Sequence, residues 1–254
     1  MGKRHESIGI KQVVRLEWYD LTLDLLLHKE SAKNIRQELT TLLRDRLQTG
    51  GFGERGVDTY GKAVTQLMQC WVTPDKDLLG LRDTALQLAE HCPRNERLPL
   101  HWAMTIAAYP FWQKVAALTG RLLNLQAQVT QAQIRARCYE TFGERSTIER
   151  SARRVIRSLV SWGVLLDTPE GNAKGCYGKS APMIIANSTT ALLLIEASLH
   201  ASGSDTLSLN AIKNDPALFP FVLPELNGSI QSSKNIEYIR HGLDHEMLRL
   251  ASLS

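Results

Sequence analysis

Residues 130–167 read TQAQIRARCYETFGERSTIERSARRVIRSLVSWGVLLD, and the predicted fold depends mainly on these residues. Thr130 is a residue type that caps the N-terminus of a helix. Ile134 and Cys138 follow at helical spacing, and Gly143 is a residue type that ends helices. We therefore expect a first helix from about Gln131 to Phe142.

The second helix of this stretch has two faces of opposite chemistry. Ser146 and Glu149 have the spacing of a capping box, which predicts that the helix begins here, and Gly163 ends it after Trp162. At about 100° per residue, the apolar side chains cluster on one side: Ile148, Ala152, Val155, Ile156 and Leu159. The opposite arc of roughly 100° holds Arg150, Arg153, Arg154 and Arg157, flanked by Ser151, Ser158 and Ser161.

The chain changes character after the second helix. Residues 164–168 are strand-like, and 169–172 (PEGN) are turn residues. Cys176-Tyr177 and residues 182–185 indicate a returning strand, with Lys174 and Lys179 near the tip. We find no strand-like alternation before residue 160, so a hairpin at about 164–186 is the expected β-structure of this part of the chain.

Helix, turn, helix, glycine and a hairpin with a basic tip is the order of a winged helix-turn-helix, and residues 130–186 resemble that family of DNA-binding proteins. The phrase SLVSWGVLLDTPEG (158–171) is similar to a recognition helix that enters a wing. In that family the second helix docks in the major groove and the wing touches backbone or minor groove. Guanidinium and hydroxyl groups contact phosphates. The expected DNA-binding residues are Arg145, Arg150, Ser151, Arg153, Arg154, Arg157, Ser158, Lys174 and Lys179.

Local charge favours this interpretation more than overall charge does. The net charge is only +4, from 30 Lys and Arg against 26 Asp and Glu. Between Arg145 and Arg157, however, five arginines stand against one acid, Glu149, whereas a solvated helix face mixes both signs. The alternatives are a winged helix that contacts only protein, or a plain solvated surface.

Helical spacing also dominates the rest of the chain. It predicts helices over 12–28, 31–48, 57–72, 76–91, 99–109, 111–119 and 188–200, several of them bounded by proline. After the loop at 202–205 we expect a short helix near 209–212 and a strand at 236–240. The fold class is therefore mainly α: a helical N-terminal domain (1–110), a winged helix-turn-helix domain (111–202) and a small C-terminal α+β module (203–254).

Motifs for catalysis are weak. Gly51–Gly56 matches G-x-G-x-x-G, but a helix is expected before it where a dinucleotide site needs a strand, so we interpret it as a loop. His241 and His245 are four apart, yet no third metal ligand can be named, which favours surface histidines. Trp102, Tyr109, Phe111 and Trp112 are expected to form a helical core. We predict no catalytic residue, no cofactor and no metal site, and hence no enzyme.

Composition is that of a globular protein, with 43% hydrophobic and 22% charged residues. No apolar segment follows the charged N-terminus, and the longest apolar run, Ala191–Ile195, is far below the roughly 18 residues that span a bilayer. The four cysteines form no C-x-x-C motif. We expect a soluble, cytoplasmic protein without a membrane partner.

The order of motifs along the whole chain resembles the BrxA family, the small helical DNA-binding component of BREX phage-defence systems. The matching segments are KNIRQELTTLLRDRL (33–47), LHWAMTIAAYPFWQKVA (100–116), TIERSARRVIRSLVSWGVL (147–165) and DPALFPFVL (215–223). The Gly51–Gly56 loop and the tail after Gly203 are candidate departures from it. The resemblance implies binding of double-stranded DNA with little sequence preference, no catalysis, and other defence-system subunits as partners. A sequence-specific transcriptional regulator and a scaffold subunit that uses the winged helix for protein contact remain alternatives.

Overall fold

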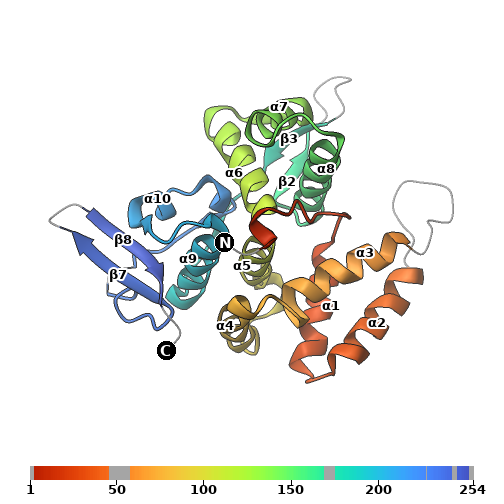
Figure 1. Ribbon diagram of the computed structural model, residues 1–254, viewed down its shortest axis with the longest axis horizontal. Helices are drawn as coiled ribbons and strands as arrows, with labels where there is room; N and C mark the ends of the chain where they lie inside the picture. The colour runs from red at the N-terminus through yellow and green to blue at the C-terminus, as the bar shows by residue number, and fades with distance from the viewer. Residues whose placement is uncertain (1–2, 46–57, 169–174, 227, 242–244, 252–254) are drawn as a thin grey trace.

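The computed structural model describes residues 3–45, 58–168, 175–226, 228–241 and 245–251, and over these residues the chain is mainly helical, as predicted (Figure 1). The α-helices are α1 (Leu16–Leu27), α2 (Ala32–Asp45), α3 (Asp58–Leu67), α4 (Leu79–Ala89), α5 (Leu98–Ala108), α6 (Pro110–Leu125), α7 (Gln131–Phe142), α8 (Ser146–Ser161), α9 (Ser188–Ser202) and α10 (Leu209–Lys213). The short strands are β1 (Gln128–Thr130), β2 (Leu165–Asp167), β3 (Cys176–Lys179), β4 (Met183–Ile184), β5 (Leu207–Ser208), β6 (Phe221–Val222), β7 (Ile236–His241) and β8 (His245–Leu250). The Gly51–Gly56 loop lies outside the described residues.

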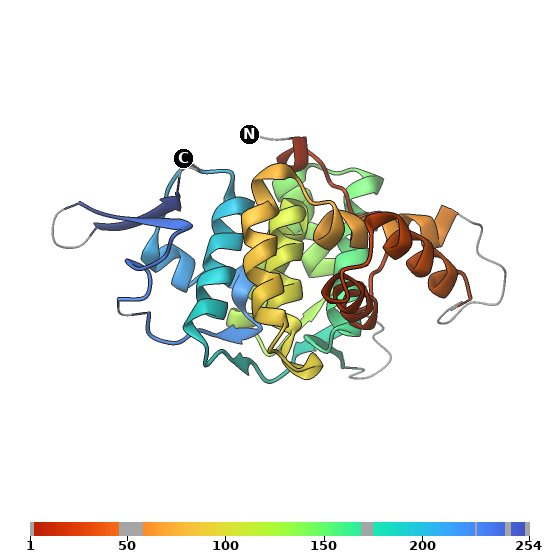
Figure 2. The same ribbon diagram turned by 90° about the horizontal axis from the view of Figure 1, so that it is seen from below.

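The centre of the molecule is α5, whose side chains are buried from Pro99 to Ala107. A helix that is apolar on all sides has no solvent face, so it needs neighbours all round. It packs along α9 and also contacts α4 and α6; Figure 2 shows these helices side by side. Trp102 of α5 and Trp112 of α6 are fully buried, and both lie against Trp162 at ring-centroid distances of 6.0 and 5.1 Å. The predicted aromatic core is confirmed.

A three-stranded antiparallel sheet in the order β1-β3-β2 stands beside α7 and α8. The β2–β3 pair confirms the expected hairpin, with Leu165 opposite Lys179. Strand β1 contradicts the expectation of no strand before residue 160. It has three residues, of which only the middle one, Val129, is buried, so it is too short to show an alternating pattern.

The returning strand is β3 alone, so the expectation that residues 182–185 belong to the hairpin is wrong. The hydrogen bond from the Ser180 amide to the Val164 carbonyl oxygen lies at the open end of the hairpin. Beyond it, β4 pairs in parallel with β6, and the Met183 amide donates to the Pro220 carbonyl oxygen. The partner of β4 therefore lies almost forty residues later, where local patterns give no information.

The N-termini of α7 and α8 are capped differently. Thr130 caps α7 as expected and forms a capping box with Gln133. The predicted capping box of α8 is absent, because Arg145 occupies the N-cap and makes no side-chain cap. The Glu149 carboxylate instead accepts hydrogen bonds from the side chains of Arg135 (3.0 Å) and Tyr139 (3.1 Å), which join α7 to α8. The expected helix ends at Gly143 and Gly163 are found, and both glycines have positive φ.

Strands β5, β8 and β7 form a second antiparallel sheet near the C-terminus, and β7 confirms the strand predicted at 236–240. Buried side chains form one cluster that continues from the N-terminal helices through α5–α9 to this sheet. The three-domain division stays a prediction. None of the described helices is long and apolar enough to cross a membrane.

Candidate nucleic-acid interface

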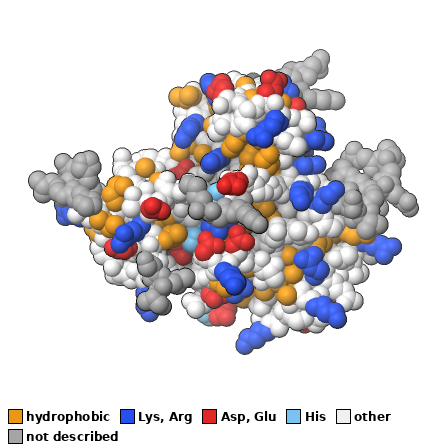
Figure 3. All heavy atoms as spheres, viewed as in Figure 1, with side chains coloured by type: hydrophobic (Ala, Val, Ile, Leu, Met, Phe, Trp, Pro, Cys, Tyr) orange, Lys and Arg blue, Asp and Glu red, His pale blue; other side chains and the backbone are white. Residues whose placement is uncertain are grey.

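Helix α8 presents arginines to solvent above a buried apolar stripe. Ile148, Val155 and Leu159 are fully buried, whereas Arg150, Arg153 and Arg157 are exposed. At about 100° per residue, these three arginines lie within an arc of about 60°. Figure 3 shows Lys and Arg side chains gathered on the side where α8 lies in Figure 1. The arrangement offers adjacent guanidinium groups to a polyanion.

Two of these arginines are positioned by nearby polar groups. The Arg150 guanidinium turns back along α8 and donates to the Ser146 carbonyl oxygen (3.2 Å). Arg157 reaches the hairpin, where it donates to both carboxylate oxygens of Asp167 at 3.1 Å. Burial lowers the pKa of Arg157, but the hydrogen bond and charge of Asp167 raise that pKa overall. Arg157 therefore links α8 to the strand that follows it.

The structure corrects the placement of Ser151 and Ser158, which do not share the exposed arginine surface. Ser151 is 5% exposed and its Oγ donates to the Ile10 carbonyl oxygen (3.0 Å). Ser158 is fully buried and its Oγ accepts from the Val14 amide (3.1 Å). Both serine hydroxyls therefore hydrogen-bond to the backbone of the N-terminal segment, residues 10–14, which lies along this side of α8.

Arg154 lies at the edge of the arginine face rather than within it. Its Nη1 donates to the same Ile10 carbonyl oxygen at 3.3 Å, and the side chain is half-buried. Burial lowers the pKa of Arg154, and the positive charges of Arg150 and Arg153 lower it further. An arginine stays protonated in spite of such shifts, so this shift reports a concentration of positive charge.

The remaining predicted residues are more scattered. Arg145 is exposed before α8 and donates to the Phe142 carbonyl oxygen (2.9 Å). Lys179 is exposed at the end of β3 and pairs with Leu165, so it lies at the base of the hairpin next to α8 and not near the tip, where we expected it. Lys174 lies outside the described residues. The structure thus brings Arg150, Arg153 and Arg157 together and places Lys179 on the neighbouring hairpin.

Sequence reasoning missed the support that α8 receives. Trp162 donates from its indole Nε1 to the Val14 carbonyl oxygen at 2.9 Å, across 148 residues of sequence. Arg135 neutralises Glu149, the one acid within the arginine-rich stretch, and lowers the pKa of that carboxyl. Neither contact has a local signal, because each joins residues that no helical or strand period relates.

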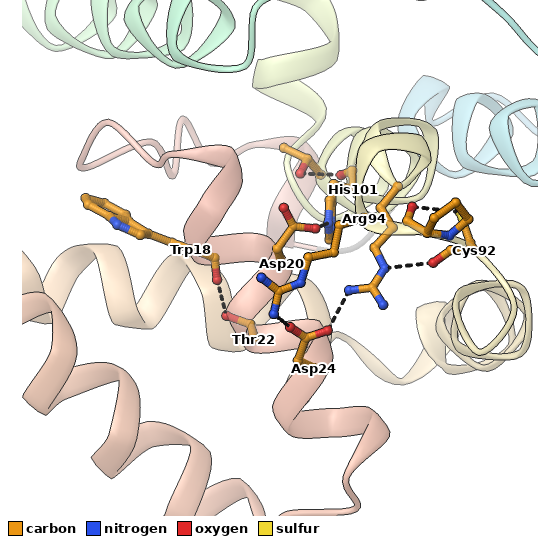
Figure 4. A network of polar contacts seen from close by, with 10 residues as sticks. Trp18, Asp20, Thr22, Asp24, Cys92, Arg94 and His101 are labelled. Atoms are coloured by element: carbon orange, nitrogen blue, oxygen red, sulfur yellow. Dashed lines mark hydrogen bonds and ion pairs between the residues drawn. The ribbon is translucent and has the colours of Figure 1, made fainter.

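A second polar cluster joins α1 to the start of α5 (Figure 4). Asp24 accepts from Arg94 and from Arg97 (2.6 Å), and these hydrogen bonds and charges lower the pKa of Asp24 although burial opposes them. His101 is fully buried and its Nε2 lies 3.1 Å from Asp20, while burial lowers the pKa of the imidazole. We assign this cluster a structural role, because its ion pairs and hydrogen bonds link α1 to the start of α5.

No group of three or more His, Cys, Asp or Glu side chains that could hold a metal occurs in the part of the chain that the structure describes. Comparison of the chain with protein-family models, with curated proteins and with solved structures gives no match. The function is therefore argued from the α8 surface.

Proposed function

We propose that this protein is a non-enzymatic binder of double-stranded DNA that inserts α8 into the major groove. The observation that carries the proposal is the arc of exposed arginines, Arg150, Arg153 and Arg157, on a helix that leads directly into a hairpin. Guanidinium groups donate paired hydrogen bonds to phosphate oxygens and to guanine edges. A helix of 16 residues is long enough to lie in the groove with several of these side chains against the duplex.

The order of elements supports a winged-helix interpretation of this region. Helix α6, strand β1, helices α7 and α8, and strands β2 and β3 follow one another, with β3 between β1 and β2 in the sheet. In this arrangement α8 corresponds to the recognition helix and the β2–β3 hairpin to the wing, with Lys179 at the base of the wing beside α8. A place in a BREX-like phage-defence system, with other subunits as partners, rests on the sequence resemblance alone.

The test is fluorescence anisotropy of the full chain with three unrelated 24-base-pair duplexes over a salt series. A double variant, Arg150→Gln with Arg153→Gln, removes two charges from α8. Because each lost phosphate contact lowers the log–log salt slope by about 0.9, the slope should fall by about 1.8 on every duplex. The matched control, Lys213→Gln with Arg249→Gln, removes two exposed charges near the C-terminus and should leave the slope unchanged.

Three results separate the candidate functions. Similar affinities on unrelated duplexes support binding with little sequence preference, whereas one tight duplex favours a specific transcriptional regulator. Wild-type protein that binds no duplex at low salt would contradict the proposal and favour a role in protein contact. If the α8 variant binds like wild type at every salt concentration, this surface does not bind DNA.

A further inference from the structure

Helix α2 carries a second group of exposed cations, separate from the arginines of α8. Lys33, Arg36 and Arg44 are exposed, and at about 100° per residue they lie within an arc of about 80°. Positions 38 and 45, which hold the two acids of the helix, are at least about 100° from each of these cations around the axis. We call Lys33, Arg36 and Arg44 the basic face of α2.

Helix stability does not explain the basic face. Within α2, the positions three and four residues from its members hold neutral side chains or another member. Lys33 and Arg36 are three residues apart, a spacing at which like charges destabilise a helix. Lys33 also lies in the first turn, where the helix dipole disfavours a cation, and no acid accompanies it there. None of the three forms an ion pair among the described side chains, and Glu30, the acid nearest to Lys33 in sequence, accepts from Asn34 instead (3.0 Å).

Packing holds the basic face in a fixed position relative to α8. Another side of α2 is buried through Ile35, Leu39 and Leu43, and the helix contacts α1 and α3. The Lys11 amide donates to Gln66 of α3 (3.1 Å). The carbonyl oxygen of the preceding residue, Ile10, accepts from Ser151 of α8 (3.0 Å). Figure 3 shows Lys and Arg side chains over α2 and over α8 on one face of the molecule, so both basic surfaces are open to the same side.

The composition of the basic face favours a polyanion over a protein partner. The exposed large hydrophobic side chains of the described residues are Leu79, Leu125, Leu166, Ile184 and Val222, and none of these lies on α2. Protein interfaces depend on buried anchors at their centre and are depleted in lysine. The Cα atoms of Lys33 and Arg44 are about 16 Å apart along the helix axis. Because double-stranded DNA has one phosphate charge per roughly 1.7 Å of its axis, a duplex along α2 presents several phosphates to the three cations.

We propose that the basic face of α2 binds backbone phosphates of the same duplex that α8 engages. This inference rests on the proposed DNA binding and adds a second contact, outside the groove that α8 enters. Phosphate contacts carry no sequence information, but they fix the orientation of a protein on the duplex. The basic face therefore orients the duplex across the N-terminal helices and adds affinity that does not depend on sequence.

The test compares a double variant, Lys33→Gln with Arg36→Gln, against wild type on duplexes of 24 and 10 base pairs. On the longer duplex the log–log salt slope should fall by about 1.8, the value for two phosphate contacts, and the affinity should fall at least about tenfold. The shorter duplex is about 34 Å long, enough for the roughly 24 Å of α8, and the variant should bind it within about twofold of wild type. The control, Lys213→Gln with Arg249→Gln, should bind both duplexes like wild type.

Two further variants separate charge from structure. Arg44→Gln alone should lower the slope on the 24-base-pair duplex by about 0.9. The charge-conserving swap Lys33→Arg with Arg36→Lys should bind like wild type, because either cation suffices for a phosphate. The urea unfolding midpoint of the Lys33→Gln, Arg36→Gln variant should not fall, since the two like charges no longer repel each other.

The outcomes distinguish the two proposals. No binding by wild-type protein at low salt contradicts the proposed function itself. Wild-type affinity and salt slope of the α2 variant on 24 base pairs, while the α8 double variant has lost binding, overturns only the contact at α2. An equal loss on both duplex lengths, or an equal loss in the C-terminal control, would also overturn it, because the charges would then act through general electrostatic attraction. A lower unfolding midpoint with unchanged DNA affinity would assign the basic face to folding and overturn the inference.

Discussion

Replacement of Ser158 by Ala should destabilise the protein without weakening its binding to DNA. The Ser158 Oγ accepts the hydrogen bond of the Val14 amide, and both residues are fully buried. In the alanine variant this N–H keeps no acceptor and no water, and such a buried group raises the free energy of the folded state by about 1–3 kcal/mol. With a denaturant slope of ~3 kcal/mol per M in urea, a loss of ~2 kcal/mol moves the unfolding midpoint down by ~0.7 M.

Ser151→Ala should have a smaller effect, because the Ile10 carbonyl oxygen keeps the hydrogen bond from Arg154. The expected loss is about 0.5–1.5 kcal/mol, the net value of one hydrogen bond. Ser161→Ala is the matched control on the same helix; its side chain is exposed, so the unfolding free energy should change by no more than about 0.5 kcal/mol.

Urea unfolding followed by circular dichroism measures the stabilities, and anisotropy under native conditions measures the DNA affinities. All three serine variants should bind DNA within about twofold of wild type, since a twofold change corresponds to only ~0.4 kcal/mol. A Ser158→Ala variant with an unchanged unfolding midpoint and several-fold weaker DNA binding would refute this reasoning, because the hydroxyl would then contact the duplex as the sequence alone suggested.

Four further substitutions test the packing and the buried charges. Gly120→Ala should lower the unfolding free energy measured in urea by at least ~3 kcal/mol, because its Cβ would lie 2.1 Å from the Pro216 carbonyl oxygen. Gly61→Ala has open space around the new Cβ and should raise the unfolding free energy by ~0.5–1 kcal/mol. Burial lowers the pKa of His200 to about 4, so the imidazole takes up a proton on unfolding. The unfolding free energy of wild type should therefore fall by up to ~3 kcal/mol as the pH drops from about 6.5 to 4. His200→Gln should show a smaller fall, and a pH profile identical to wild type would contradict a buried neutral imidazole. Asp24→Asn should lower the unfolding free energy at pH 7 by about 2–3 kcal/mol. Because the pKa of Asp24 is lowered in the folded protein, this difference from wild type should shrink as the pH falls below about 4. A difference that stays constant with pH would argue against the ion pairs.

Local signals explain which parts of the fold the sequence could predict. The bounds of α7 agree with the expected 131–142, because a capping threonine, an apolar pair at i,i+4 and a terminal glycine all lie within fourteen residues. The buried stripe of α8 follows directly from its helical period. Each of these features depends on residues within a few turns of one another.

The serines of α8 show where such reasoning fails. Ser151 is three residues from Ile148 on the buried side and three residues from Arg154 on the polar side, so its angle on the helix is equally close to both. Ser158 repeats this position seven residues later. Only the presence of residues 10–14, which contribute their backbone groups, decides that these hydroxyls are buried. The same holds for β4, whose parallel partner β6 cannot be identified from local spacing.

The contacts between residues 10–14 and α8 also have a consequence for folding during synthesis. Val14 is made 144 residues before Ser158, its partner on α8. At roughly 5–20 residues per second, a ribosome needs about 7–30 s to complete this interval. Throughout that time the backbone groups of Ile10 and Val14 have no α8 to bind, so this segment can dock on α8 only after that helix has been synthesised. Such non-local closure is slow relative to helix formation, and it makes the emergence of α8 the event that completes the N-terminal half of the fold.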